Sequence, residues 1–162
     1  MKNLFTLIIL IFSLSAYSAE KCQIEDAGEE LLANDPKCVY FSGTKAFRNK
    51  NYELAAKYWE QIILLTPTSY EHLELKIDAL NNLGYLLFYG DGINQNQNKA
   101  IEYWEKAASM GHLESEFHLC HGYADRNEQT YNKNRALLHC YKAQLIYQGI
   151  TNPEDSDKEC WK

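Results

Sequence analysis

The apolar residues of the chain recur at helical spacing, and the pattern is clearest in residues 83–111. Leu83 and Leu87 lie one helical turn apart, a glycine-rich break follows at residues 90–92, and residues 99–110 form a second amphipathic run that a glycine closes. The stretch therefore predicts two helices that are joined by a turn.

The same pattern occurs on both sides of this stretch. Residues 39–66 predict a helix, a turn at residues 49–51 and a second helix, which Pro67 ends. Residues 70–89 predict one longer helix. A weaker copy of the pattern follows the central stretch and ends at Gly149. Because a single amphipathic pair cannot bury its own apolar face, we expect the pairs to stack.

Residues 1–19 have the pattern of a secretory signal peptide. Lys2 supplies a positive charge, residues 4–14 are apolar but too few to span a membrane comfortably, and small residues follow. Cleavage after Ser18 or Ala19 fits this pattern best, and an uncleaved anchor helix is the alternative. No second segment is apolar enough to span a bilayer, so we expect a soluble mature protein in a bacterial periplasm, with eukaryotic secretion as the alternative.

The 162-residue chain has a formal net charge of −6 and no cluster of basic residues. We do not expect such a protein to bind nucleic acid, whose phosphates require basic side chains. An anionic membrane surface is a poor partner for the same reason. The natural electrostatic complement is a basic protein.

Residues 83–111 resemble the Sel1-like repeat, a relative of the tetratricopeptide repeat. The family pattern is Leu-Gly, an aromatic residue, Gly-x-Gly, Lys-Ala, an aromatic residue, and Lys-Ala-Ala before a final glycine. The matching residues are Leu83-Gly84, Tyr85 with Tyr89, Gly90-Asp91-Gly92, Lys99-Ala100, Trp104, and Lys106-Ala107-Ala108 with Gly111. The preceding pair is similar to a tetratricopeptide repeat, at Gly43, Ala46, Tyr52, Ala55, Trp59 and Pro67.

This resemblance implies an all-α fold, a short α-solenoid of about three helix pairs that disulfides support. The predicted organisation is a signal peptide at 1–19, an N-terminal helical arm at 20–36, a tetratricopeptide-like helix pair at 37–69, a Sel1-like repeat at 70–113, a degenerate Sel1-like repeat at 114–150 and an acidic C-terminal tail at 151–162.

Five cysteines follow the predicted signal peptide, which suits an oxidising compartment. The disulfide candidates are Cys22, Cys38, Cys120, Cys140 and Cys160. Because five is an odd number, at least one cysteine is free or pairs between chains. A Cys22–Cys38 bridge would tie the N-terminus that signal cleavage creates to the first repeat.

The third repeat differs from the central one at two cysteines. Cys120 stands where the central repeat has Gly84, and Cys140 stands where it has Trp104. Both cysteines thus replace residues that the family packs inward, which favours a Cys120–Cys140 bridge. A bridge from either cysteine to Cys160 is the alternative.

Three histidines lie close in sequence to these cysteines: His118, His121 and His139. Histidine and cysteine are the usual ligands of zinc, so a metal site is one interpretation of the cluster. A disulfide with ordinary histidines is the other, and we expect no metal and no cofactor. A catalytic Cys–His pair lacks any motif that would orient it, so we expect no enzyme activity.

In these repeat families the first helix of each pair lines a concave groove in which ligands lie. The resemblance places twelve residues there: Tyr40, Thr44, Phe47 and Arg48 from the first pair, Asn81, Tyr85, Phe88 and Tyr89 from the second, and Phe117, His121, Ala124 and Asp125 from the third. Aromatic residues and arginine often anchor protein interfaces. The alternative is that Phe47 and Phe88 pack in the core at the repeat junctions.

The resemblance implies a non-enzymatic module that binds another protein. Small Sel1-like proteins with a signal peptide include immunity proteins, which neutralise toxic effectors of the type VI secretion system such as phospholipases. A general periplasmic adaptor or scaffold is the alternative function. A cysteine-rich Sel1-like hydrolase and a secreted factor directed at a host are two further alternatives. The sequence leaves the oligomeric state open.

Overall fold

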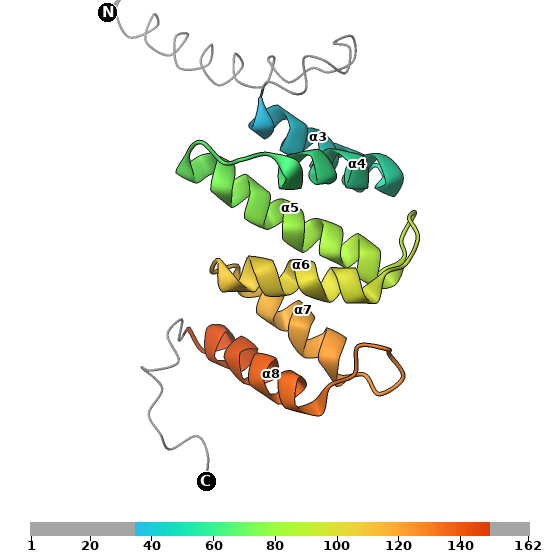
Figure 1. Cartoon of the computed structure of the whole chain (residues 1–162), viewed down its shortest axis with the longest axis vertical. Helices are drawn as coiled ribbons and strands as arrows, with labels where there is room; N and C mark the ends of the chain where they lie inside the picture. The colour runs from blue at the N-terminus through green and yellow to red at the C-terminus, as the bar shows by residue number, and fades with distance from the viewer. Residues whose placement is uncertain (1–34, 150–162) are drawn as a thin grey trace, which may run out of the picture.

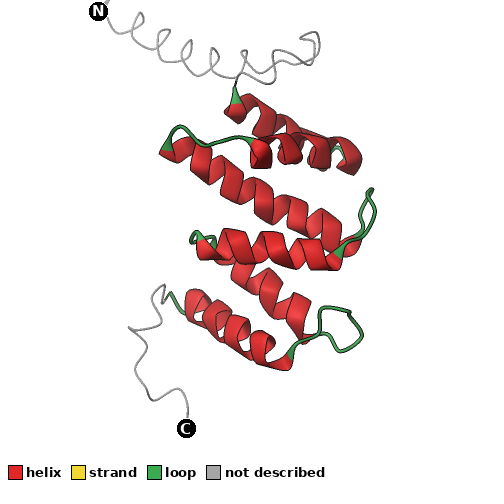
Figure 2. Cartoon of the chain, viewed as in Figure 1, coloured by secondary structure: helices red, strands yellow, loops and turns green. Residues whose placement is uncertain are grey.

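A computed structural model describes residues 35–149, which form six helices and no strand (Figures 1 and 2). The helices are α3 (Pro36–Arg48), α4 (Tyr52–Leu64), α5 (Tyr70–Tyr89), α6 (Gln97–Ser109), α7 (Leu113–Ala124) and α8 (Lys133–Tyr147). The predicted all-α solenoid with disulfide support is confirmed. The predicted signal peptide and tail, and the predicted arm before Asp35, lie outside the described residues.

Of the six described helices, all except α7 begin at a side chain that caps them. The Asp35 carboxylate accepts from the backbone N–H groups of Lys37 and Cys38, and Pro36 fills the first helical position, where no N–H is needed. The residues that cap α4, α5, α6 and α8 in the same way are Asn51, Ser69, Asn96 and Asn132. These caps are local in sequence, which is why the helix starts can be predicted without tertiary information.

The helices stack in chain order along the long axis of the molecule, as Figure 1 shows. α3 packs on α4, α5 on α6, and α7 on α8, while α4–α5 and α6–α7 contacts join the pairs. The first helices of the pairs also contact one another, α3 with α5 and α5 with α7. We call the surface that their exposed sides form the first-helix face.

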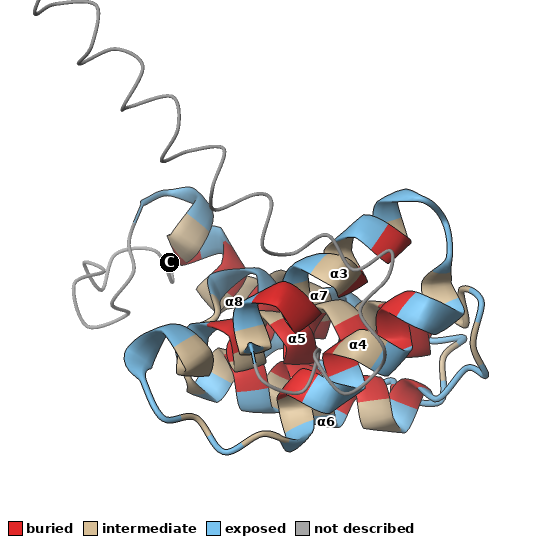
Figure 3. Ribbon diagram, turned by 90° about the horizontal axis from the view of Figure 1, so that it is seen from above, coloured by how far each residue is buried: buried red, intermediate tan, exposed pale blue. Residues whose placement is uncertain are grey.

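The larger of two apolar clusters in the described residues runs through the stack, from Val39 in α3 to Ala136 in α8. Leu83, Leu86 and Leu119 are completely buried in it. Every described helix contributes buried residues, and Figure 3, which looks along the stack, shows a concentration of them on α5. None of the described helices is both long enough and apolar enough to cross a membrane.

Candidate functional site

The exposed side of α5 carries one continuous row of side chains. Residues three or four positions apart lie on the same face of a helix. The members of the row are exposed or half-buried, and we call them the α5 stripe: Glu71, Glu74, Asp78, Asn82, Tyr85 and Tyr89. Since α5 is the middle of the three first helices, the stripe runs through the centre of the first-helix face.

Aromatic rings surround the C-terminal end of the α5 stripe. The ring of Tyr85 lies 4.8 Å from that of Tyr89, 6.4 Å from that of Phe47 and 6.1 Å from that of His118. The Tyr52 ring lies 5.3 Å from Phe47. These five residues form the aromatic cluster, and they bring α3, α4, α5 and α7 together at one place.

The aromatic cluster is open to solvent on one side. Tyr89 is 52% exposed, while Tyr85 is half-buried. Burial raises the pKa of Tyr85, and the negative charge of Asp91 raises it further. The Tyr85 hydroxyl therefore stays protonated at neutral pH and can donate a hydrogen bond. Large amphipathic rings with a polar end are the side chains that commonly anchor protein interfaces.

The middle of the α5 stripe is polar. The Asn82 amide donates to the Tyr40 hydroxyl at 3.2 Å, which links α5 to α3. Burial raises the pKa of Tyr40, and the charge of Asp78 adds to this rise. Asp78 also lies 3.4 Å from Nε2 of His112, the residue that precedes α7. Polar contacts thus join all three first helices here.

A serine, a histidine and an aspartate lie here in the arrangement of a hydrolase triad: Ser115, His112 and Asp78. His112 Nδ1 lies 2.9 Å from Ser115 Oγ, and His112 Nε2 faces Asp78. Ser115 is completely buried, however, and its hydroxyl donates to Asn81 Oδ1 at 2.9 Å. A substrate cannot reach that oxygen, so the arrangement holds the start of α7 against α5 and does not form a nucleophile.

The structure places the predicted groove residues in three environments. Arg48, Tyr89, His121, Ala124 and Asp125 are exposed, and Tyr40, Thr44, Phe47, Tyr85 and Phe117 are half-buried. The prediction is wrong for Asn81 and Phe88, which are 3% and 6% exposed. Asn81 accepts from Ser115, and the Phe88 ring packs 5.2 Å from Trp104, so both belong to the interior.

Sequence reasoning missed several residues of the first-helix face. From the α5 stripe and the aromatic cluster these are Glu71, Glu74, Asp78, Asn82, Tyr52 and His118, the last of which was assigned only to the histidine and cysteine cluster. Counting back from Tyr85 in steps of three and four reaches Asn82 and Asp78, so helical spacing could have found both. Tyr52 belongs to a second helix, and only the packing of α4 on α3 brings it to this face.

The histidine and cysteine cluster separates in the structure. Cys120 and Cys140 form a disulfide with their Cα atoms 4.5 Å apart, so the alternative bridges from these two residues to Cys160 are wrong. His139 Nδ1 lies 2.5 Å from Glu116, and the His118 ring stacks on Trp104 at 4.8 Å. Among residues 35–149, no group of three or more side chains is arranged to hold a metal ion.

The first cysteine pair is described only in part. Cys38 is disulfide-bonded. Cys22, which the sequence predicts as its partner, lies outside the described residues, and so does Cys160. The predicted Cys22–Cys38 bridge therefore stays a prediction.

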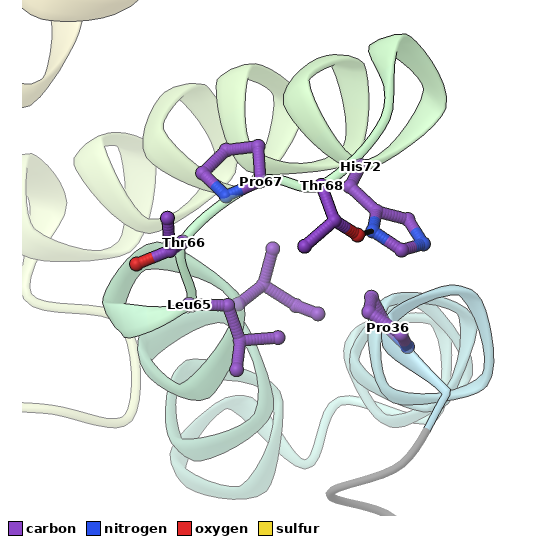
Figure 4. A pocket seen from close by; sticks show the side chains of 7 residues that line it. Pro36, Leu65, Thr66, Pro67, Thr68 and His72 are labelled. Atoms are coloured by element: carbon purple, nitrogen blue, oxygen red, sulfur yellow. Dashed lines mark hydrogen bonds between the residues drawn. The ribbon is translucent and has the colours of Figure 1, made fainter.

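A pocket of about 250 Å³ lies where the start of α3 meets the α4–α5 connection (Figure 4). Its lining residues are Pro36, Ile62, Leu65, Thr66, Pro67, Thr68 and His72. Thr68 Oγ1 lies 2.9 Å from His72 Nδ1, the contact dashed in Figure 4. No carboxylate, lysine or arginine lines the pocket and no residue of the aromatic cluster reaches it, so it offers mainly apolar contact.

The comparisons with known proteins agree with the repeat architecture. The family model of the Sel1 repeat matches residues 29–65 and residues 77–112. The second range covers most of α5 and all of α6, and it ends before α7. No curated protein and no solved structure matches the chain. With six stacked helices among residues 35–149 and two matched repeats, the chain is a Sel1-like repeat protein.

Proposed function

We propose that this protein is a non-enzymatic module that acts in the periplasm and binds another protein through its first-helix face. Sel1 repeats generally mediate protein–protein interaction. The observation that supports this face in particular is the aromatic cluster, because a tyrosine pair, half-buried Tyr85 and half-exposed Tyr89, lies at the junction of three first helices. The periplasmic location rests on the signal-like pattern of residues 1–19.

An enzymatic function has less support. The Ser115–His112–Asp78 arrangement is closed to substrate, and the cysteines nearest to histidines are bonded to each other. The pocket in Figure 4 holds one histidine and no second acid or base. General acid–base chemistry requires a positioned proton donor or acceptor that a substrate can reach.

The finer form of this proposal is an immunity protein that holds a toxic secreted effector, such as a phospholipase, inactive. It rests on the small size of the chain, the signal-like start and the resemblance to small signal-bearing Sel1-like proteins. A general periplasmic adaptor would use the same surface. The two forms differ in their partners, because an immunity protein binds one dedicated partner tightly and an adaptor binds several.

The test is capture of partners from an envelope fraction with tagged protein, residues 20–162, read by mass spectrometry. The double change Tyr85→Ala and Tyr89→Ala removes the tyrosine pair. Tyr147→Ala is the matched control, since Tyr147 is 86% exposed on α8 and lies away from the aromatic cluster. Circular dichroism must show an unchanged helical signal in both variants.

We expect one stoichiometric partner that the control retains and the double variant loses. If that partner is a toxic hydrolase, co-expression with this protein should restore the growth of cells that produce the hydrolase. That result would support the immunity-protein form of the proposal. Several partners that are all lost in the double variant would favour the adaptor. Partners retained equally by wild type and double variant would contradict the proposed binding face.

A further inference from the structure

The α5 stripe is divided into two chemically different halves. Its N-terminal half carries the carboxylates of Glu71, Glu74 and Asp78, and its C-terminal half carries the rings of Tyr85 and Tyr89. The helix rises about 1.5 Å per residue, so Glu74 and Tyr89 are about 22 Å apart along its axis. A ligand that lies along α5 would therefore meet carboxylates first and aromatic rings second.

A second helix adds to the acidic half. Glu114 in the first turn of α7 is exposed, and its carboxylate accepts from the Asn81 amide at 3.4 Å. That contact places Glu114 beside the middle of α5, close to the turn that carries Asp78. Asp91 follows α5 and faces Tyr85 closely enough to raise the pKa of its hydroxyl. Carboxylates thus lie at both ends of the tyrosine-bearing face.

Among these carboxylates in the described part of the chain, a lysine pairs only with Glu71, and histidines lie near Asp78 and Glu114. The single lysine of α5, Lys76, donates to the Leu65 carbonyl at 2.8 Å, and α7 contains neither lysine nor arginine. Lys37 pairs with Glu71 at 2.6 Å. Among residues 35–149, no ion pair involves Glu74 or Asp91.

This local excess is distinct from the net charge of the chain. Acidic and basic side chains are nearly balanced over residues 35–149, while residues 20–34 and 151–162 are acidic. The net charge therefore says little about the first-helix face. The charge that a ligand meets is set by which side chains the helices turn outward, and along α5 and the start of α7 these are acids.

We propose that the first-helix face binds a basic, amphipathic polypeptide segment of its partner. Lysine or arginine side chains of that segment pair with Glu74, Asp78 and Glu114, and an apolar or planar side chain stacks on Tyr85 and Tyr89. Arginine suits both halves, since its guanidinium pairs with carboxylates and stacks on aromatic rings. Complementary charge would also speed association and orient the segment along α5. This inference rests on the proposed function and names the chemistry of the partner.

The experiment selects from a random peptide library displayed on phage, and the bait is the tagged protein of residues 20–162 with its disulfides intact. The selected peptides are then synthesised with a fluorophore, and Kd is measured by anisotropy at low and at physiological salt. The charge-reversal variant is Glu74→Lys with Glu114→Lys. The matched control is Glu60→Lys with Glu102→Lys, which changes the net charge equally on the exposed sides of α4 and α6.

We expect the selected peptides to be basic and to contain an aromatic or long apolar residue. Their Kd should rise about tenfold or more in the charge-reversal variant and by much less in the control. Binding should also weaken as salt increases, because exposed charges are screened. Glu74→Lys alone keeps the test available if the double variant does not fold, since Glu74 is exposed.

Two results would overturn the inference in different ways. If the peptides are neutral or acidic, or bind the charge-reversal variant as tightly as wild type, while Tyr85→Ala with Tyr89→Ala abolishes binding, the binding face stands and its charge preference is wrong. If no peptide is enriched, or if none distinguishes wild type from either variant, both the inference and the proposed function fail.

Discussion

The second and third helix pairs are held together at equivalent positions by different interactions. In α5–α6, Gly84 faces the Trp104 indole so closely that a Cβ atom on the glycine would lie 2.6 Å from Trp104 Nε1. In α7–α8 the corresponding residues are Cys120 and Cys140, which form a disulfide. A buried ring fills the close approach in one pair, and a covalent bond closes it in the other.

The second and third pairs also differ in their neighbours. The α5–α6 pair has neighbours on both sides, so the Trp104 ring packs on Phe88 at 5.2 Å and on His118 at 4.8 Å. The last described helix, α8, leaves Leu137 and Leu138 exposed. A terminal pair gains less from burial than an internal pair. A disulfide does not depend on neighbours, because it stabilises mainly by restricting the unfolded chain.

The first pair repeats the Gly–Trp contact with one difference. A Cβ atom on Gly43 would lie 2.7 Å from Trp59 Nε1, much as in the second pair. Trp104 Nε1 donates to the Asn81 carbonyl at 3.1 Å, whereas Trp59 Nε1 is buried without a hydrogen-bond partner in the described structure. Burial of an unsatisfied N–H is costly, so the two indoles should not contribute equally to stability.

The largest effect is expected from Trp104→Ala. Removal of this completely enclosed ring should lower the free energy of unfolding by about 3–5 kcal/mol. Urea denaturation followed by circular dichroism measures the loss. The comparison with the first pair uses phenylalanine: Trp104→Phe loses a hydrogen bond and should cost about 1 kcal/mol more than Trp59→Phe, which removes an unsatisfied N–H. Equal costs would show that the indole hydrogen bond is irrelevant.

The double change Cys120→Ala with Cys140→Ala should lower the free energy of unfolding by about 3 kcal/mol, as the closure of a loop of this length predicts. Hydrogen exchange should locate the loss in α7 and α8 and leave the first two pairs protected. Cys120→Gly with Cys140→Trp restores the residue types of the second pair. Its stability should exceed that of the alanine variant if the two contacts are equivalent, and a lower value would contradict their equivalence.

Gly84→Ala should cost about 1–3 kcal/mol, because the new methyl group meets a rigid indole. The matched change is Gly122→Ala in α7, where a Cβ atom would lie 2.7 Å from Cδ1 of Ile101. The tip of an isoleucine side chain can rotate away, so this variant should lose less stability. Thermal unfolding of the two variants side by side tests the ranking, and the reverse order would argue against it.

The smallest effect is a dependence on pH at the contact between the second and third pairs. Burial lowers the pKa of His118 below 6.5; the charge of Glu114 opposes the shift, and His112 and His121 add to it. Because the unfolded chain then binds more protons, stability should fall as pH drops below about 6.5. His118→Phe keeps the stacking on Trp104, so the urea midpoint of this variant should not change between pH 7.5 and 5.5.

A second loss should appear at lower pH. Burial raises the pKa of Glu116, but hydrogen bonds from His139 and Lys142 outweigh it and hold this pKa below its usual 4.5. A depressed carboxyl pKa contributes stability that is lost as pH falls through the folded value. The His118→Phe variant should therefore keep this acid transition. A urea midpoint that stays constant down to acid pH would contradict a stabilising role for the ion pairs of Glu116 with His139 and Lys142.

The sequence predicted where the helices are, but not which side of each helix faces the core. Asn81 was assigned to the binding face and Asn82 was not, yet Asn81 is buried and Asn82 reaches Tyr40. Adjacent residues on a helix differ by about 100° in direction, so an error of one position exchanges the core for the surface. Phe88 shows the same limit, because its side chain could serve equally well in a groove or against Trp104.

By itself, the sequence determined the helix pairs, their caps and their repeat register, since each depends on residues that are close along the chain. Asp35-Pro36 begins a helix and Gly90 ends one through local backbone geometry alone. Only the tertiary structure decided which side of α5 faces outward, that Cys120 bonds to Cys140, and that Tyr52 joins Tyr85 at one surface. These features depend on how helices rotate and pack against each other, and that is settled by side-chain contacts between distant parts of the chain.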